Sequence, residues 1–106
     1  MFSLFGKSNF NSVSAAELKD KIGKVNLIDV REVYEYKAGH VPKAKNVPLG
    51  TITAQPDKYM DKEKEYFIIC QSGARSASAC RALAGAGYQV VNVSGGTGSY
   101  PFALER

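Results

Sequence analysis

A short apolar run that ends on a cysteine and passes directly into a loop of small residues constrains the fold more than any other stretch. Residues 66–69 are apolar and rich in aromatic and β-branched side chains, as in a parallel strand covered on both faces. Cys70 follows at the carboxyl end of this predicted strand, and a helix is expected from about Arg75. Gly73 lies between them and lets the chain curl tightly. The sequence therefore predicts a strand–loop–helix unit.

The predicted loop is suited to bind an anion. Amide N–H groups of a curled loop and of the first turn of a helix point at one spot. We expect Cys70 at the rim of that spot, where the helix N-terminus and a guanidinium favour the thiolate. Arg75 is expected to hold a sulfonate or phosphate group against the cysteine. We interpret Cys70 as a nucleophile, because an inert core thiol would not need this loop and arginine.

Composition excludes several classes of protein. A chain of 106 residues is expected to form one domain, with residues 1–8 as a loose N-terminal segment and residues 9–106 as the folded domain. The net charge is +4, but no basic block reaches five residues in a row, so nucleic-acid binding has little support. No apolar run approaches the roughly 20 residues of a membrane span. The N-terminus lacks the basic start and apolar core of a signal peptide.

The two cysteines, Cys70 and Cys80, have neither a C-x-x-C spacing nor a histidine cluster beside them. We therefore expect neither a metal site nor a disulfide framework. A reducing compartment is the natural interpretation, and the protein is placed in the cytoplasm. Cys80 shares a predicted buried stripe with Ser76, Ala79 and Leu83. We expect it to be a core thiol that faces the sheet, while Cys70 points into an opposite, solvent-open cradle.

Predicted strands and helices alternate along the chain, which indicates an α/β domain with a parallel sheet. The predicted strands are residues 9–13, 25–30, 44–47, 66–69 and 90–93. The predicted helices are residues 15–22 after a Ser14–Glu17 capping box, 32–37, part of 51–64, 75 to the glycines at 85 and 87, and a closing helix over 100–104.

Polar or small residues follow three of the predicted strands. They are Asp29 and Arg31, the loop from Cys70 to Arg75, and Gly95 with Gly96. Because ligands bind beyond the carboxyl ends of parallel strands, these residues are expected to surround one site. We interpret Asp29 and Arg31 as a buried, paired structural network. His40, the only histidine, is interpreted as a hydrogen-bonded scaffold residue.

Three separated segments together resemble the rhodanese-like sulfurtransferase family. The first comprises residues 27–36 with Gly39-His40-Val41-Pro42, the second is Cys70-Gln71-Ser72-Gly73-Ala74-Arg75-Ser76, and the third combines Gly87-Tyr88 with Gly95-Gly96. They occur in the family's order and spacing, over about residues 13–100. The resemblance implies a five-stranded parallel sheet flanked by helices on both faces.

The resemblance also implies a function. Cys70 would accept a sulfane sulfur as a persulfide, without a cofactor, and pass it to cyanide, a thiol or a sulfur-accepting protein. Gln71, Ser72, Gly73, Ala74, Arg75 and Ser76 would bind the substrate and stabilise the terminal sulfur. We expect a monomer that uses small sulfur donors.

The chain departs from the family pattern at a few positions. Lys43 replaces a usual glycine and Tyr100 a usual tryptophan, and both changes concern packing. Residues 71–74 also lack a second basic side chain. This favours a persulfide or polysulfide donor over doubly charged thiosulfate.

Two alternatives stay open. Phosphatases and arsenate reductases of related fold use a similar cysteine and arginine, but their loop is one residue longer, and the shorter loop here suits a single sulfur atom. A persulfide carrier or a non-catalytic binding module is the other alternative. The intact Cys70, Gly73 and Arg75 argue against a module without chemistry but are compatible with a carrier.

Overall fold

The computed structural model describes residues 9–106, so the expected loose segment 1–8 lies outside the described residues. A five-stranded parallel sheet organises the chain, with strand order β1-β5-β4-β2-β3. The strands are β1 (Asn11–Ser14), β2 (Asn26–Asp29), β3 (Lys45–Asn46), β4 (Glu65–Ile69) and β5 (Gln89–Ser94). The predicted parallel α/β sheet is therefore confirmed, and Cys70 follows its central strand.

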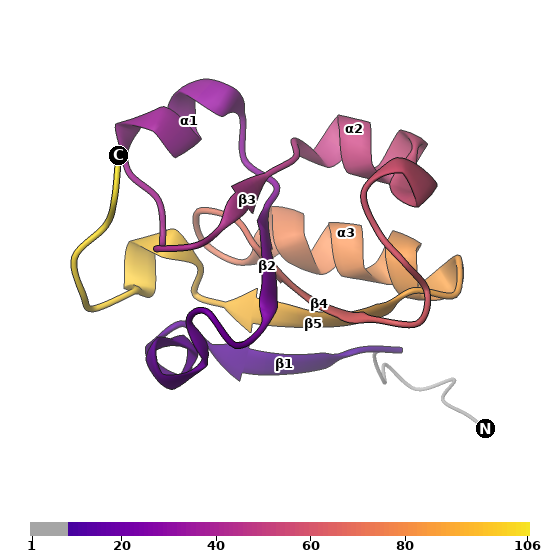
Figure 1. Ribbon diagram of the computed structural model, residues 1–106, viewed down its shortest axis with the longest axis horizontal. Helices are drawn as coiled ribbons and strands as arrows, with labels where there is room; N and C mark the ends of the chain where they lie inside the picture. Colours follow the sequence, from indigo (N-terminus) through magenta and orange to yellow (C-terminus); the bar gives the residue numbers. More distant parts are fainter. Residues whose placement is uncertain (1–8) are drawn as a thin grey trace.

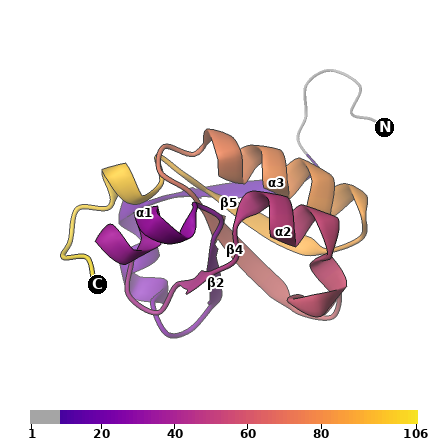
Figure 2. The same ribbon diagram turned by 90° about the horizontal axis from the view of Figure 1, so that it is seen from above.

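Within residues 9–106, three α-helices and three 3₁₀ helices accompany the strands, and all but the last helix lie between two strands. The helices are η1 (Ala16–Lys21), α1 (Val33–Ala38), α2 (Leu49–Ala54), η2 (Pro56–Lys58), α3 (Ala74–Gly85) and η3 (Thr97–Ser99). Figures 1 and 2 show α2 and α3 side by side over one face of the sheet. No helix among residues 9–106 combines the length and the apolar character needed to cross a membrane.

Each face of the sheet has its own apolar core, because successive side chains of a strand point to opposite faces. Ile68 of β4 packs with α2 and α3, whereas Phe67 and Ile69 pack on the other face with Leu18 of η1. Ile68 and Ile69 are both fully buried. This explains why the sequence of β4 is continuously apolar rather than alternating.

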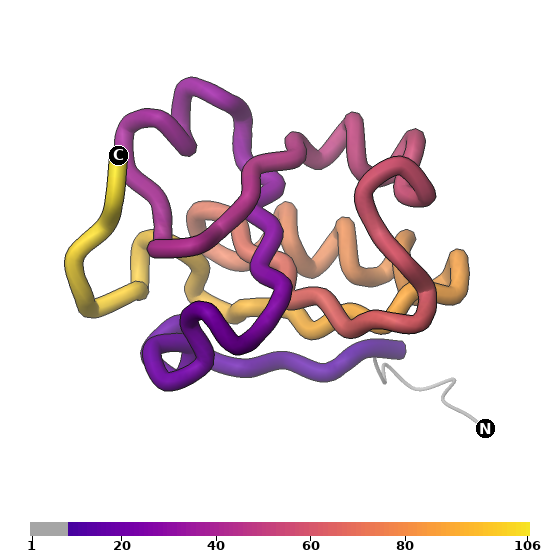
Figure 3. Tube along the Cα trace, in the orientation of Figure 1, coloured from indigo at the N-terminus to yellow at the C-terminus, as the bar shows by residue number. Residues whose placement is uncertain are grey.

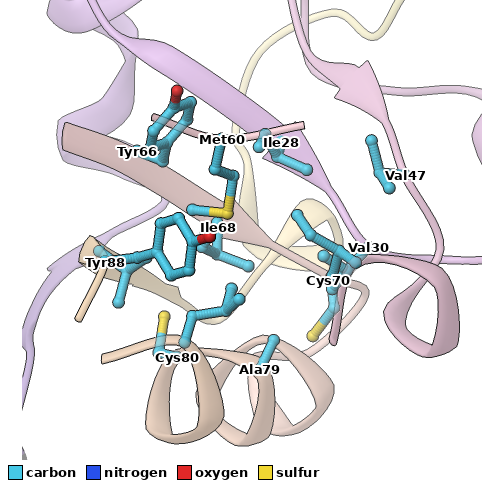
Figure 4. Packing of buried hydrophobic residues seen from close by; sticks show 13 residues of the cluster. Ile28, Val30, Val47, Met60, Tyr66, Ile68, Cys70, Ala79, Cys80 and Tyr88 are labelled. Carbon is cyan, nitrogen blue, oxygen red and sulfur yellow. The ribbon is translucent and has the colours of Figure 1, made fainter. Parts of the chain in front are cut away.

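The buried stripe predicted for α3 is confirmed, but the predicted separation of the two cysteines is wrong. Ser76, Ala79, Cys80 and Leu83 are all buried. Cys70 and Cys80, however, belong to the same cluster, between the sheet and α3 (Figure 4). The physical reason is alternation along the strand, since Cys70 continues the face of β4 that Ile68 presents, and α3 covers that face.

The first predicted helix has a different geometry in the structure. The segment after Ser14 forms the 3₁₀ helix η1 rather than an α-helix, as is common in short connectors. The expected capping contacts are nevertheless present, since the Ser14 amide donates to Glu17 Oε1 at 2.8 Å and the Glu17 amide to Ser14 Oγ at 3.2 Å.

The prediction of a closing helix over residues 100–104 is wrong, because these residues form no helix. His40 and Glu105 form an isolated antiparallel bridge, in which each amide donates to the other's carbonyl at 2.8 Å. These bonds tie the end of the chain to the segment before β3 (Figure 3). The backbone groups of Glu105 bond to a distant segment instead of to a preceding helical turn, so a tertiary contact decides the conformation here.

The buried stripe of α3 predicts a large effect of Leu83→Ala. Leu83 is 1% exposed within the core on the α2 and α3 side, and truncation of such a leucine costs about 3 kcal/mol through lost burial and a cavity. Urea denaturation would measure the loss. Arg81→Ala, at an exposed position of the same helix, is the control and should change stability by less than about 0.5 kcal/mol. Equal effects of the two substitutions would contradict the packing described here.

Candidate active site

The structure brings the three polar strand ends together at one edge of the sheet. Arg31, which follows β2, donates from Nη1 to Gln71 Oε1 at 3.1 Å. The turn after β5 reaches the same loop, since the Thr97 amide donates to the carbonyl oxygen of Cys70 at 2.8 Å. Residues far apart in the sequence therefore meet around the loop that follows Cys70, as the parallel topology predicts.

The loop encloses the sulfur atom of Cys70. The Gly73 amide donates to Cys70 Sγ at 3.0 Å, and Sγ lies 3.3 Å from Ser76 Oγ. Gly73 has φ +106°, a conformation that favours glycine and turns its N–H inward. Cys70 is fully buried, whereas Gln71 and Ser72 are exposed. The expectation of a solvent-open thiol is therefore wrong, because the side chain points beneath the loop rather than out of it.

Two opposing effects set the pKa of the Cys70 thiol. Burial raises the pKa, because the charged thiolate is poorly solvated inside the protein. The hydrogen bond with the Ser76 side chain and those from the backbone N–H groups of Ser76, Gly73 and Ser72 favour the thiolate and outweigh burial, so the pKa lies below its ordinary value. The loop therefore increases the fraction of thiolate, the nucleophilic form of cysteine, near neutral pH.

The turn after β5 orients the loop from its other side. Thr97 donates from its amide and its hydroxyl to the Cys70 carbonyl, at 2.8 and 3.0 Å, and the Gly98 amide donates to the Gln71 carbonyl at 2.9 Å. In a planar trans peptide the N–H points opposite to the C=O. Holding these two carbonyls toward the turn therefore directs the amides of Gln71 and Ser72 away from it, toward the interior of the loop.

Gly96 allows this close approach. A Cβ at this position would lie 2.5 Å from the Cys70 carbonyl oxygen. Its backbone angles, φ 62° and ψ −159°, fall in a region essentially restricted to glycine. Gly95 and Gly96 were predicted at this site from the sequence, but Thr97, which follows them directly in the same turn, was not. Its position after the double glycine was the available signal.

Asp29 and Arg31 form the buried pair that the sequence suggested. Their side chains are 0% and 4% exposed. Arg31 donates from Nε and Nη2 to the Asp29 carboxylate at 2.8 to 3.0 Å, and from Nη2 to the Gly39 carbonyl at 2.8 Å. Together with the hydrogen bond from Nη1 to Gln71, these bonds engage all three nitrogen atoms of the Arg31 guanidinium. Arg31 therefore supports the start of the loop.

Arg75 has a partner that the sequence analysis did not name. Its guanidinium donates from Nη1 and Nη2 to the two carboxylate oxygens of Glu35 in α1, at 2.8 and 2.9 Å. The hydrogen bond from Arg75 is the main cause that lowers the pKa of Glu35 to about 2, and the same bond raises the pKa of Arg75. Forty positions separate the two residues. The only available signal was Glu35 as an acidic residue in the first turn of a predicted helix.

An open pocket lies beside the loop. It is lined by Arg31, Glu35, Gln71 and the C-terminal residues Tyr100, Phe102 and Leu104. Phe102 and Leu104 are 42% and 43% exposed, which gives the pocket an apolar wall opposite its charged one. A molecule bound in this pocket can therefore contact both polar and apolar groups next to Gln71.

His40 has the expected scaffold geometry. Its ring stacks on Tyr36 with centroids 3.7 Å apart, and Nδ1 lies 3.0 Å from the Tyr36 carbonyl oxygen. It is not among the residues that contact Cys70 Sγ. Within residues 9–106, no three side chains of His, Cys, Asp or Glu are grouped so that they could hold a metal ion.

The fold and the site define a class of protein, an α/β domain whose central strand delivers a cysteine into a curled amide loop. Residues 14–100 match the rhodanese-like domain, and the chain belongs to this family. A putative sulfurtransferase of Bacillus subtilis, YtwF, is 42% identical over 87 residues, which cover 79% of this chain and 84% of that protein.

Two further proteins illustrate the similarity. The thiosulfate:glutathione sulfurtransferase of Saccharomyces cerevisiae is 32% identical over 100 residues, covering 76% of this chain and 70% of that protein. The crystal structure of SSP1007 from Staphylococcus saprophyticus superposes with a TM-score of 0.81 at 36% identity, covering 92% of this chain and all of that one. The family resemblance and the fold it implied are therefore confirmed.

The lowered pKa of Cys70 predicts a distinct pH profile of alkylation. The rate with iodoacetamide, followed by peptide mapping, should reach half its plateau at a lower pH for Cys70 than for the same cysteine in the urea-unfolded chain. The pKa of Cys70 is lower in the folded than in the unfolded protein. Ionisation of this thiol therefore stabilises the folded protein above the unfolded pKa, and this stabilisation is lost as the pH falls through the folded pKa. Cys80, whose pKa burial raises to about 12, should stay unmodified in the folded protein. A Cys70 midpoint at or above the unfolded one would contradict this account.

Gly96→Ala should disrupt the loop. The added Cβ would collide with the Cys70 carbonyl and strain the backbone, so we expect a loss of at least about 2 kcal/mol in unfolding free energy. We also expect slower alkylation of Cys70, because its loop must move. Gly50→Ala is the matched control, since a Cβ there meets no atom within 4 Å. A Gly96→Ala protein with wild-type stability and alkylation would refute the assigned role.

Proposed function

We propose that the protein is a sulfurtransferase in which Cys70 accepts a sulfane sulfur, holds it as a persulfide and passes it to a thiophilic acceptor. The observation that carries the proposal is the surroundings of Cys70 Sγ, with the Gly73 amide at 3.0 Å and the Ser76 hydroxyl at 3.3 Å. These groups favour a charged sulfur at this place. The sulfurtransferase names of two similar proteins support the same reaction class.

The proposed reaction has two steps. In the first, the Cys70 thiolate attacks the sulfane sulfur of the donor, a new S–S bond forms, and the donor's own S–S bond breaks. The electron pair leaves with sulfite when the donor is thiosulfate, or with a thiolate when it is a persulfide. In the second, cyanide, a thiol or a protein thiol attacks the terminal sulfur, and the Cys70 thiolate leaves. Atoms and electrons balance without a cofactor.

The loop would act mainly by electrostatics. The terminal sulfur of a Cys70 persulfide would carry negative charge, and the amides of Ser72, Gly73 and Ser76, which already favour the thiolate, would donate to it. The proposal includes no separate base, since the lowered pKa of Cys70 increases the fraction of thiolate. A working thiolate also requires a reducing compartment, which is why the cytoplasm remains our expectation.

Phosphatase or arsenate reductase chemistry is the less favoured enzyme alternative. The loop already contacts the single sulfur atom of Cys70 closely, through Gly73 and Ser76. A phosphoryl group, with three oxygens to accommodate, would need a wider cradle than this C-x4-R loop. A persulfide carrier would use the same geometry as the proposed enzyme and differs only in turnover. Repeated formation of thiocyanate from donor and cyanide would favour the enzyme.

Cys70→Ser should abolish sulfur transfer while the protein stays folded, because a hydroxyl here is a poor nucleophile without a paired base. Thiocyanate formation and intact-mass analysis for one added sulfur atom would measure the loss. Cys80→Ala is the control, since Cys80 is buried away from the loop amides, and it should retain both signals. Near wild-type turnover in Cys70→Ser would refute the mechanism.

A further inference from the structure

Two ion pairs lie at the carboxyl edge of the sheet, near the loop that follows Cys70. Arg31 pairs with Asp29, and Arg75 pairs with Glu35. Residues 71–74 add no charge. Each of these pairs is formally neutral, although the whole chain carries +4.

Only one of the two pairs is accessible to a donor. The Arg31–Asp29 pair has side chains 4% and 0% exposed, whereas those of Arg75 and Glu35 are 38% and 20% exposed. Glu35 also lines the open pocket beside Gln71. The charge of Cys70 contributes to raising the pKa of Arg75, which indicates that this pair and the sulfur are electrostatically linked.

Glu35 is fixed in position as well as in charge. Its Oε1 accepts from Arg75 Nη1 at 2.8 Å and from the Glu32 amide at 2.9 Å, as part of the capping box that begins α1. The carboxylate cannot swing away from Arg75 without also giving up this cap. With a pKa near 2 it stays ionised at any working pH.

We propose that Glu35 is a specificity-determining residue, which neutralises Arg75 and thereby disfavours doubly charged sulfur donors relative to singly charged ones. This inference rests on the proposed sulfur transfer. Glu35 acts in two ways: it occupies both terminal nitrogens of the arginine that would otherwise bind a sulfonate, and its own charge repels an anion. A donor with two negative charges experiences that repulsion twice as strongly as a donor with one.

A matched pair of donors tests the proposal. Thiosulfate carries two negative charges and benzenethiosulfonate one, and both present a sulfane sulfur bonded to a sulfonyl-type sulfur. Attack by the Cys70 thiolate releases sulfite from the first and benzenesulfinate from the second, so the bonds formed and broken are alike. The ratio of their kcat/KM values, measured from release of these products with cyanide as acceptor, therefore isolates the effect of donor charge.

Glu35→Gln should raise the thiosulfate to benzenethiosulfonate ratio about 3- to 10-fold at low salt, mainly through a lower KM for thiosulfate, and less at high salt. Glutamine retains an oxygen that can accept from the Glu32 amide. Arg75→Gln, which leaves the charge of Glu35 without a partner, should lower the ratio.

Glu17→Gln is the matched control, because Glu17 is also a capping-box carboxylate but is exposed and paired with Ser14. It makes the same change in net charge and should leave the ratio unchanged.

The outcomes separate this inference from the proposed function. An unchanged ratio in Glu35→Gln, or an equal change in Glu17→Gln, would overturn the role of Glu35 while sulfur transfer stands. If the wild-type protein transfers sulfur from neither donor, the proposed function itself is overturned.

In that case alkylation of Cys70 still tests the charge effect of Glu35. Glu35→Gln should raise the rate of alkylation by anionic iodoacetate relative to that by neutral iodoacetamide. A purely structural role would slow both reagents equally and leave that ratio constant.

Discussion

The hydrogen bonds from the turn after β5 to the carbonyls of Cys70 and Gln71 are the constraint on which the site depends. Without them the two peptide planes could rotate, and the amides beyond would no longer face the sulfur. The contact is possible only because Gly96 lacks a side chain. Two neighbouring strands of the sheet thus build the site together, since Cys70 follows β4 and the turn after β5 fixes the backbone around it.

Burial and a lowered thiol pKa are compatible at Cys70 because the hydrogen-bonding groups of the loop replace water. A buried thiol surrounded only by apolar atoms holds its proton, as Cys80 does. Cys70 belongs to the same apolar cluster, yet its pKa moves in the opposite direction because amides and a hydroxyl surround its sulfur atom. The two cysteines of one core therefore differ in chemistry through their hydrogen-bond partners and not through their depth.

The sequence predicted the sheet, the position of Cys70 and the residues that meet at the strand ends, because apolar runs and glycine-rich turns are local patterns. It did not predict the pairing of Arg75 with Glu35, since a contact across 40 positions depends on how α1 and α3 are placed in space. The error about Cys70 was avoidable, because counting alternate residues from Ile68 already assigns it to the face that α3 covers. The end of the chain was misjudged because its partner, His40, lies in a distant segment.

The bridge between His40 and Glu105 has a consequence for how this site can change. The wall formed by Tyr100, Phe102 and Leu104 belongs to a segment that is anchored by backbone bonds at Glu105 and by the turn after β5. Backbone anchors do not depend on side-chain identity. Substitutions at the exposed Phe102 and Leu104 can therefore reshape the approach to the loop without disturbing the sheet or the backbone around Cys70.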